Sequence, residues 1–463
     1  MKEFDVVVIG SGPGGYTTAI RASQLGMKTA IIERDRLGGV CLNWGCIPTK
    51  ALLKNAELMN GLKHLNDFGI SVENVQFDFE KIISRSRGVA DISEKGVRYL
   101  MKKNKIDVFE GSAYINKDKS VSVNDKSGKE TEKIKAKNII IATGAKTRGL
   151  GDLKFDEKKV LSSTGAMLLK ELPKKMTVVG SGAIGVEFAY FYNAFGTEVT
   201  VIEMMPNIMP VEDKDISDVV AREFKKSGIK LLTGTKTESV EVKGDKVITK
   251  VSGKSSEEIE SDVVLIAIGV TGNTEKFGLE DLGVKIEKGN IIVDRDYKTN
   301  VEGIFAIGDV IGPPWLAHVA SSEGINCVEK IKGMHVPDID YSTIPGCTYC
   351  QPQVASVGLT EKKALEEGYE INVGKFPYSA SGKSRAMGET VGMIKVIFDK
   401  KYDELIGAHI VGVEATELIM EFVLAKSLEA THEQILKTVH AHPTLSEANM
   451  EAVGVAYNEA INI

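Results

Sequence analysis

The stretch FDVVVIGSGPGG (residues 4–15) decides the fold of the first part of the chain. Its continuous apolar run predicts a parallel strand that is covered on both faces. Gly10, Gly12 and Gly15 follow in G-x-G-x-x-G register, a helical pattern comes next, and a second strand ends at Glu33. In such a unit the first glycine makes the turn, the second lets a pyrophosphate approach the backbone, and the third lets the helix pack on the strand. The stretch therefore predicts a dinucleotide site in which Glu33 accepts hydrogen bonds from a ribose.

The same unit recurs 170 residues further on, in KMTVVGSGAIG. Gly180, Gly182 and Gly185 keep the register, and in both copies the closing acidic residue, here Glu203, lies 23 residues after the first glycine. Two unliganded glycine turns are the alternative, but each copy has the complete pattern. No Lys or Arg lies between Glu203 and Lys214, so an NADP 2′-phosphate would meet an uncompensated carboxylate at a cost on the order of 4 kcal/mol. The second site is therefore predicted to bind NAD(H).

Three further apolar runs end in glycine or in Gly-Asp, at residues 137–144, 262–269 and 303–310. The third run follows the second nucleotide unit, so we expect one nucleotide domain to be discontinuous, with the other inserted into it. Asp309 lies at the carboxyl end of this run, where ligands of open α/β sheets bind. A carboxylate there suits the ribityl hydroxyls of FAD, and an ordinary turn aspartate is the alternative.

The bulk composition excludes several classes of function. The chain has 463 residues, enough for two to four domains, and a formal net charge of -6. Binding of nucleic acid is not expected from this charge, and no apolar run reaches the roughly 18 residues of a membrane helix. The N-terminus enters a strand directly and has an acidic residue at position 3, unlike a signal or transit peptide. The chain has five cysteines, which predicts a reducing, cytoplasmic location.

Two of the cysteines, Cys41 and Cys46, lie in GGVCLNWGCIPTK (residues 38–50). Three roles are open to these cysteines: zinc ligands, a structural disulfide, or a redox pair. The C-x4-C spacing is poor for zinc ligation, and no metal is expected. In a regular helix residues five apart have Cα atoms about 8.6 Å apart, too far for a disulfide. The glycines and Pro48 are expected to break the helix, with Pro48 in the first turn of the next one. Cys46 would then lie near a positive helix end, with Lys50 one turn further, which favours a reactive thiol.

The order of the motifs GSGPGG, GGVCLNWGCIPTK, ATG, GSGAIGVE, AIGD, LAH and HAHPTLSE resembles the pyridine nucleotide-disulphide oxidoreductases over essentially the whole chain. The resemblance implies an α/β fold with two Rossmann-like dinucleotide-binding domains, the NAD domain inserted in the FAD domain, and a C-terminal α+β dimerisation domain. The implied segments are 1–145 (FAD, first part), 146–270 (NAD), 271–342 (central domain completing the FAD site) and 343–463 (dimer interface).

The resemblance also implies roles for single residues. Cys41 would exchange with the substrate, and Cys46 would face the flavin. Lys50 and Glu187 would pair beside the flavin, and the N-terminus of a helix that opens at residue 317 would face its pyrimidine end. The cofactor-binding residues expected on this basis are Gly10, Gly12, Gly14, Gly15, Glu33, Lys50, Thr143, Gly144, Asp309, Ala317, His318, Gly180, Gly182, Gly185, Glu203 and Gly269.

Thiol–disulfide exchange needs a group that takes a proton from the incoming dithiol. In HAHPTLSE, His442 precedes Pro443 and is expected in a turn, and Glu447 can accept a hydrogen bond from its ring and fix the tautomer. From the residues alone, an ordinary surface contact is the alternative. The resemblance implies a catalytic dyad in which His442 reaches the active site of the other subunit, so that catalysis requires a homodimer. His440 is interpreted as support or spectator.

Within the family, the match is nearest to the members that oxidise protein-bound dihydrolipoamide to lipoamide with reduction of NAD+. The implied partners are lipoylated carrier proteins of 2-oxo acid dehydrogenase or glycine-cleavage complexes. Three alternatives are an NAD(P)H-dependent reductase of another disulfide such as glutathione, a mercuric reductase, and a non-catalytic FAD-bearing scaffold. The chain ends without a cysteine pair, which disfavours the second, and the intact redox motif disfavours the third.

Several positions depart from the family pattern. Cys347 and Cys350 have redox-like spacing but are predicted to be residues of a strand in the interface domain, and Cys327 to be a buried helix residue. Val270 stands where relatives commonly carry Arg, which leaves contacts on the NAD side open. Trp44, between the two redox cysteines, replaces a smaller residue and either narrows the thiol environment or only packs.

Overall fold

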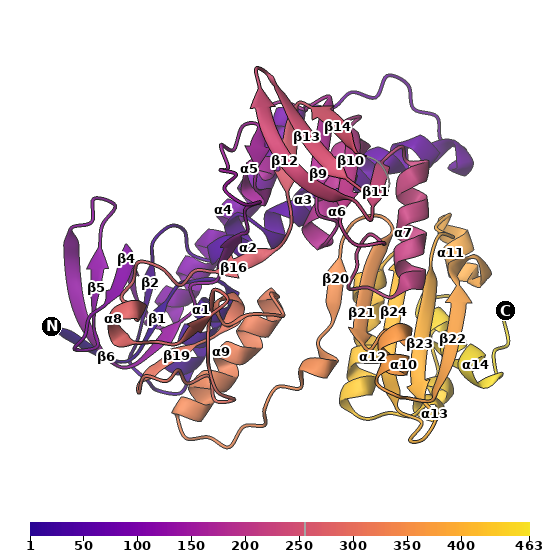
Figure 1. The fold of residues 1–463 in the computed structure, drawn as a ribbon. Helices are drawn as coiled ribbons and strands as arrows, with labels where there is room; N and C mark the ends of the chain where they lie inside the picture. The colour runs from indigo at the N-terminus through magenta and orange to yellow at the C-terminus, as the bar shows by residue number, and fades with distance from the viewer. Residues whose placement is uncertain (254–255) are drawn as a thin grey trace. The chain divides into compact units, whose positions relative to one another are not determined.

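The computed structural model describes residues 1–253 and 256–463, and the chain divides into two compact units (Figure 1). The first unit contains residues 1–52, 78–148 and 269–339, and the second contains residues 53–77, 149–268 and 340–463. The return of the chain to the first unit after residue 268 agrees with the expected discontinuous nucleotide domain. The four finer segments expected from the sequence stay a prediction.

A mainly parallel sheet forms the centre of the first unit. The strands run in the order β3-β2-β1-β6-β5-β4, and β19 pairs with β6. Their bounds are β1 (Lys2–Ile9), β2 (Thr29–Glu33), β3 (Asp107–Glu110), β4 (Ser112–Ile115), β5 (Ser120–Asn124), β6 (Glu130–Ile141) and β19 (Ile304–Ala306). Strand β1 lies between two parallel neighbours, and Val6, Val7 and Val8 are fully buried, which explains its unbroken apolar run. The pairing of β19 with β6 shows that residues 304–306, from the predicted run 303–310, join this sheet.

Two helices that are distant in sequence pack side by side in this unit, α1 (Pro13–Gln24) and α9 (Ala317–Ile331). Their close approach requires glycine, because a Cβ on Gly324 would lie 1.9 Å from Thr18 Oγ1 and a Cβ on Gly14 3.0 Å from the Ala320 carbonyl oxygen. The other elements of the unit are α2 (Gly39–Asn43), α4 (Phe79–Lys103), β7 (Ala145–Thr147), β16 (Val270–Gly272), α8 (Leu279–Leu282), β17 (Ile286–Glu287), β18 (Asn290–Ile291) and η2 (Gly308–Ile311).

The second unit contains a second parallel sheet, which carries the repeat of the nucleotide motif. Its order is β11-β10-β9-β15-β8, with all neighbours parallel. The bounds here are β8 (Val160–Leu161), α5 (Ser163–Met167), β9 (Lys175–Val179), α6 (Ala183–Ala194), β10 (Glu198–Glu203), α7 (Lys214–Lys226), β11 (Lys230–Thr233) and β15 (Val263–Ile266). An antiparallel sheet, β12 (Lys236–Lys243), β13 (Lys246–Ser252) and β14 (Glu257–Ser261), precedes the last strand. The chain passes from the first unit to this one within helix α3 (Cys46–Gly61). The 3-10 helix η1 (Leu62–Phe68) follows α3.

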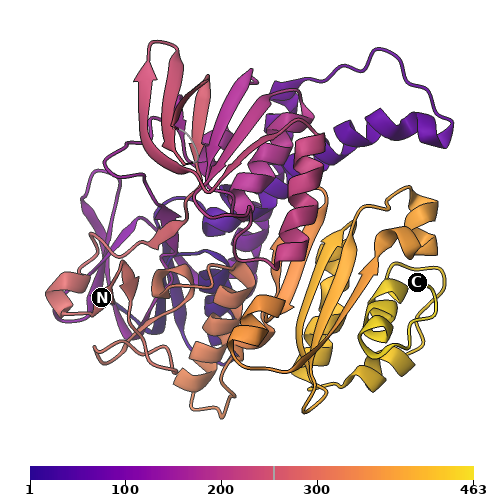
Figure 2. The same cartoon turned by 45° about the vertical axis from the view of Figure 1, so that its right-hand side comes forward.

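The C-terminal part of the second unit is an antiparallel sheet packed against helices, in the order β20-β21-β24-β23-β22. Figure 2 shows the yellow C-terminal helices beside this orange sheet. Its elements are η3 (Tyr341–Thr343), β20 (Gly346–Thr348), β21 (Gln353–Gly358), α10 (Glu361–Glu366), β22 (Ile371–Pro377), η4 (Tyr378–Ala380), α11 (Gly382–Met387), β23 (Met393–Asp399), β24 (Leu405–Gly412), α12 (Ala415–Ser427), α13 (His432–Lys437) and α14 (Glu447–Tyr457). Residues of the sheet and of α12 and α14, such as Phe398, Phe422 and Val453, share one apolar core. These three sheets confirm the predicted fold class.

Among the helices of residues 1–253 and 256–463, none is long and apolar enough to cross a membrane.

Candidate redox and cofactor sites

The first glycine motif has the backbone geometry that a dinucleotide turn requires. Gly10 has φ +99°, and a Cβ there would lie 2.3 Å from the Ala142 carbonyl oxygen. A Cβ on Gly15 would lie 1.9 Å from the Gly10 carbonyl oxygen, so only glycine lets α1 approach the strand. A Cβ on Gly12, in contrast, would meet no atom within 4 Å. The open space at the second glycine, at the start of a 12-residue helix, fits the place of a pyrophosphate.

The second motif repeats this geometry. Gly180 also has φ +99°, and its Cβ would lie 2.3 Å from the Ala267 carbonyl oxygen. A Cβ on Gly185 would lie 2.0 Å from the Gly180 carbonyl oxygen, and the position at Gly182 is open. The two units of the molecule therefore contain the same glycine turn, whose binding of phosphate stays a prediction.

The closing glutamates also occupy equivalent positions. Glu33 Oε2 accepts hydrogen bonds from the backbone N–H (2.9 Å) and hydroxyl (2.6 Å) of Ser11. Glu203 Oε2 accepts the same pair from Ser181, at 3.0 and 2.7 Å. In both copies Oε1 accepts the backbone N–H two residues further on. Each carboxylate is thus fixed at the carboxyl end of its strand, beside the glycine turn, and its bond to a ribose stays a prediction.

The residues of the first unit also fit the flavin part of FAD. Asp309 lies in η2, where burial and the negative charge of Glu323 raise its pKa to about 6. Glu323 is itself buried, and its Oε2 accepts the Gly308 N–H at 2.7 Å. A buried carboxyl with a raised pKa is short of hydrogen-bond donors, and hydroxyl donors such as those of a ribityl chain would stabilise its ionised form.

Two more predicted residues border the same region of the sheet. Thr143 follows β6, and its hydroxyl donates to the Asn273 carbonyl at 2.8 Å, while Gly144 adopts φ +67°. Helix α9 begins at Ala317, as expected, and its N-cap residue Leu316 has no side-chain acceptor for the first N–H groups. These N–H groups are suited to an electron-rich ring edge.

The two redox cysteines lie on different helices. Cys41 lies in α2, and α3 begins at Cys46, with Trp44 and Gly45 between them. The expected break is present, and Pro48 lies in the first turn of α3 as predicted, although the helix begins two residues before it, at Cys46. The reason is that the Gly45 carbonyl accepts both the backbone N–H (3.0 Å) and the hydroxyl (2.7 Å) of Thr49, which closes the first turn earlier.

The side chains of these two cysteines are in contact. The pKa of the half-buried Cys41 is raised, first by a hydrogen bond with Cys46, then by burial and by the charge of Cys46, while Lys50 lowers it. Cys46 is exposed. A hydrogen bond between the two thiols brings them close enough for a small movement to form a disulfide. Zinc ligation or a purely structural disulfide would leave the exposed thiol and the nearby lysine without a role.

The structure adds residues that the sequence analysis missed. Tyr16, on α1, has its pKa raised by burial and by the charge of Cys41, so it lies near the redox pair. The signal for it was its place directly after the third glycine of the motif. Trp44, which the sequence had singled out, donates from Nε1 to Asp35 Oδ2 at 2.9 Å. Arg87, on α4, contacts the same turn, and nothing in the local sequence pattern points to it.

The dyad expected in the C-terminal part is present as a hydrogen bond. His442 Nδ1 contacts Glu447 Oε1 at 2.8 Å, with the side chains 79% and 28% exposed. The pKa of Glu447 is lowered, first by the Thr444 N–H, which donates to Oε2 at 2.8 Å, and then by His442. An ionised Glu447 holds the proton on Nδ1, so Nε2 is the basic nitrogen. His440 Nε2 contacts Glu421 Oε1 at 2.8 Å, in agreement with a supporting position.

The other predicted residues are each placed locally. Lys50 lies in the first turns of α3. Glu187 lies in α6, is 5% exposed, and accepts the Tyr349 N–H at 3.0 Å. The pairing of Lys50 with Glu187 stays a prediction. Gly269 adopts φ +109° before β16, and Val270 pairs with Thr147 in β7.

The remaining cysteines occupy structural positions. Cys347 lies in β20 as predicted, but the prediction is wrong for Cys350, which lies two residues beyond the strand. Cys350 is fully buried and donates to the Pro352 carbonyl at 3.3 Å. Cys327 is fully buried in α9, which confirms the prediction for it.

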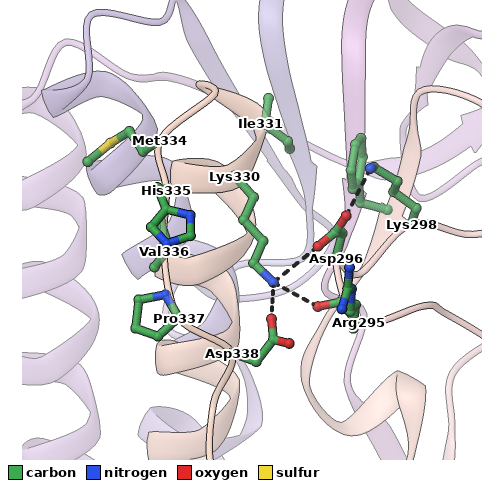
Figure 3. A pocket seen from close by; sticks show the side chains of 11 residues that line it. Arg295, Asp296, Lys298, Lys330, Ile331, Met334, His335, Val336, Pro337 and Asp338 are labelled. Atoms are coloured by element: carbon green, nitrogen blue, oxygen red, sulfur yellow. Dashed lines mark hydrogen bonds and ion pairs between the residues drawn. The ribbon is translucent and has the colours of Figure 1, made fainter.

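A cavity of about 490 Å³ lies at the C-terminal end of α9, and none of the predicted site residues lines it (Figure 3). Lys330 spans it, with Nζ at 2.6 Å from Asp338, 3.1 Å from Asp296 and 3.0 Å from the Arg295 carbonyl oxygen. These contacts connect the segment that follows α9 to α9 itself, so we assign the cavity a structural role within the first unit.

Two family models match the chain. The model described as pyridine nucleotide-disulphide oxidoreductase matches residues 4–324, and the model described as the dimerisation domain of that family matches residues 344–453. The resemblance found in the motifs is confirmed by these matches, and the second one supports a homodimer.

Curated relatives and solved structures agree. The dihydrolipoyl dehydrogenase of Rhizobium etli is 50% identical over 479 residues, covering 100% of this chain and 99% of the relative, and that of Zymomonas mobilis is 45% identical over 463 residues, covering 99% of each. The crystal structure of LpdA from Mycobacterium tuberculosis matches with a TM-score of 0.90 at 24% sequence identity. The Cu(II) complex of the HOCl-induced flavoprotein disulfide reductase RclA from Escherichia coli matches with a TM-score of 0.87 at 28% identity. Each match covers 98% of this chain and 99% of the matched structure. The fold is thus shared over the full length.

Proposed function

The chain belongs to the pyridine nucleotide-disulphide oxidoreductase family, and we propose that it oxidises dihydrolipoyl groups on carrier proteins, with reduction of NAD+, through the thiols of Cys41 and Cys46. The cofactors of the family are FAD and NAD. The observation that carries the proposal is the contact between these two thiols at the start of α3, in the unit with the first glycine motif. The substrate is the one named by the curated relatives.

The chemistry at the thiols is an exchange of disulfides. A thiolate of the dihydrolipoyl group attacks Cys41 in the Cys41–Cys46 disulfide, the bond between the two cysteines breaks, and Cys46 leaves as a thiolate. The second substrate thiol then attacks the substrate sulfur that is bonded to Cys41 in the mixed disulfide. Cys41 leaves, and the lipoyl disulfide is released. The substrate loses two electrons and two protons, and the cysteine pair gains the electrons. When bound, FAD supplies the two-electron relay between the thiol pair and NAD+.

The acid–base group in this proposal is His442. With Nδ1 held by Glu447, Nε2 accepts the proton of the first substrate thiol and so generates the attacking thiolate. The proton of the second substrate thiol passes to Cys41 as it leaves, which its raised pKa favours. The partner subunit's His442 performs the first of these proton transfers in each active site, so the functional form is a homodimer. The match of residues 344–453 to a dimerisation domain and the exposure of the His442 side chain support this arrangement.

The nucleotide and the location follow from charge and redox chemistry. Glu203 is followed by the exposed residues Met204 and Met205, and the first cation after it, Lys214, pairs with Asp218 at 2.5 Å. This setting supports NAD(H) over NADP(H), because the segment that follows Glu203, residues 204–213, offers no Lys or Arg to a 2′-phosphate. The proposed partners are lipoylated carriers of 2-oxo acid dehydrogenase or glycine-cleavage complexes. The proposed location is the cytoplasm, a reducing compartment that suits a thiol pair in turnover.

Steady-state assays of the FAD-loaded protein test the substrate. We expect NADH oxidation with lipoamide to be at least about a hundredfold faster than with oxidised glutathione, and NADPH to be a poor donor. Cys46→Ser, which cannot form the disulfide, is the matched control and is expected to lose lipoamide turnover. Equal or faster turnover of glutathione would make the protein a reductase of another disulfide, and wild-type FAD protein without any disulfide turnover would support the scaffold alternative.

A further inference from the structure

The turn between the two redox cysteines is held by a residue of a distant helix. Arg87, on α4, donates from Nη1 to the Asn43 carbonyl at 2.7 Å, at the last residue of α2. Its guanidinium carbon lies 5.0 Å from the centre of the Trp44 ring. Arg87 therefore contacts the last residue of the helix that carries Cys41 and the residue that follows it, Trp44.

The contacted residues are themselves fixed. Asn43 is fully buried, and its Nδ2 donates to the carbonyls of Leu37 (2.9 Å) and Gly39 (3.0 Å). Trp44 donates from its indole to Asp35. Because these side chains leave few conformations for the turn, the arginine completes a rigid connection between α2 and α3.

Helix α4 is anchored on both sides of this connection. Before it, Arg36 pairs with Asp91 at 2.6 Å, and after it, Arg85 donates to the Ala51 carbonyl at 3.0 Å. Burial and then the charge of Arg36 lower the pKa of Arg87, and the charge of Asp91, which pairs with Arg36, raises it. Burial of a cation costs free energy that hydrogen bonds offset, and the Asn43 carbonyl, in the segment between the two cysteines, accepts one from Arg87.

We propose that Arg87 is a positioning residue of the redox pair, which fixes the Asn43–Gly45 turn and favours the reduced, thiolate-bearing form of Cys41 and Cys46. The guanidinium donates to the carbonyl of Asn43, the last residue of the helix that carries Cys41. Its planar face on Trp44 restricts the spacing of the two sulfur atoms. The proposal rests on the proposed function only in taking Cys41 and Cys46 as the redox pair; it does not depend on the identity of the substrate.

The test compares Arg87→Met and Arg87→Lys with the wild-type FAD holoenzyme. We measure the equilibrium between the disulfide and dithiol forms against NADH/NAD+, and the rate at which each reduced cysteine is alkylated by iodoacetamide, resolved by mass spectrometry. In Arg87→Met we expect the equilibrium to shift about tenfold toward the disulfide, or about 30 mV, with slower alkylation of Cys46. Arg87→Lys keeps the charge but not the planar contact, and is expected to shift about threefold.

Arg98 provides the matched control on the same helix, because it is exposed and pairs only with Glu94 and Glu110 among the described ion pairs. Arg98→Met and Arg98→Lys are expected to leave the equilibrium and the alkylation rates unchanged. If Arg87→Met does not fold, Arg87→Lys against Arg98→Lys carries the test. Wild-type values in both Arg87 variants would overturn the proposal, whereas a wild-type protein that turns over no lipoamide would overturn the proposed function and leave this comparison intact.

Discussion

Asp309 is a single residue whose protonation connects burial with cofactor binding. Its pKa is raised to about 6, so near pH 5 the FAD-free protein holds a proton there, which an exposed aspartate would have lost. If a ribityl hydroxyl donates to this carboxylate, FAD binds the ionised form more tightly. Binding must then release the proton, and the apparent affinity for FAD falls as the pH drops below about 6, by up to tenfold per unit.

The measurement is a titration of the FAD-free protein with FAD between pH 5 and pH 8, by calorimetry in two buffers of different ionisation enthalpy. We expect proton release near pH 5.5 in the wild type and none from this site in Asp309→Asn, which also binds FAD more weakly at pH 8. Equal proton release in both proteins would show that Asp309 is not the group that loses a proton when FAD binds, and would contradict the expected hydrogen bond from the ribityl chain.

At the residue scale, sequence reasoning succeeded where local chemistry is decisive. Cys41, Cys46 and the His442–Glu447 bond could be predicted because each pair lies within five residues. Arg87 could not, because its contact with Asn43 spans 44 residues and depends on how α4 packs. A half-buried arginine on a long helix has no signature in a single sequence.

The packing of α1 against α9 gives a prediction at the scale of elements. A methyl group on Gly324 would overlap Thr18 Oγ1 and the Gly14 carbonyl oxygen, at 1.9 and 2.9 Å, so the two helices must separate. We expect Gly324→Ala to lower the free energy of unfolding by about 1–3 kcal/mol. We also expect weaker FAD binding, since α1 begins at the proposed pyrophosphate turn and α9 at the proposed flavin site. Chemical denaturation and FAD retention measure the two effects.

The matched control is Gly96, inside α4, where an added Cβ meets no atom within 4 Å. Gly96→Ala is expected to raise the free energy of unfolding by up to about 1 kcal/mol, because alanine loses less conformational entropy in a helix. If both substitutions destabilise the protein equally, the close approach of α1 and α9 is not what requires glycine at residue 324.

The elements themselves were predictable to different degrees. The two glycine motifs and their strands follow from a pattern that leaves one conformation open, as Gly10 and Gly180 with the same φ demonstrate. The exact start of α3 does not follow from the sequence pattern, because a proline only limits how many helical residues precede it. The hydrogen bonds from Thr49 to the Gly45 carbonyl then determine that the helix begins at Cys46.

At the scale of the whole molecule, the proposal requires that each active site combine two chains. His442 is mostly exposed on its own chain, within the residues that match the dimerisation domain.

The test is a heterodimer of two variants. We co-express Cys46→Ser and His442→Gln, each with a different affinity tag, and purify the heterodimer through both tags. If the partner subunit's His442 serves each thiol pair, the heterodimer has one site with intact cysteines and an intact histidine, and we expect about half the wild-type lipoamide turnover. Either homodimer is expected to retain only a few per cent, since each lacks one of the two groups in both sites. If the histidine acted on the thiols of its own chain, the heterodimer would contain no complete site and would be as inactive as the two homodimers, so the measured turnover distinguishes a shared active site from an enclosed one.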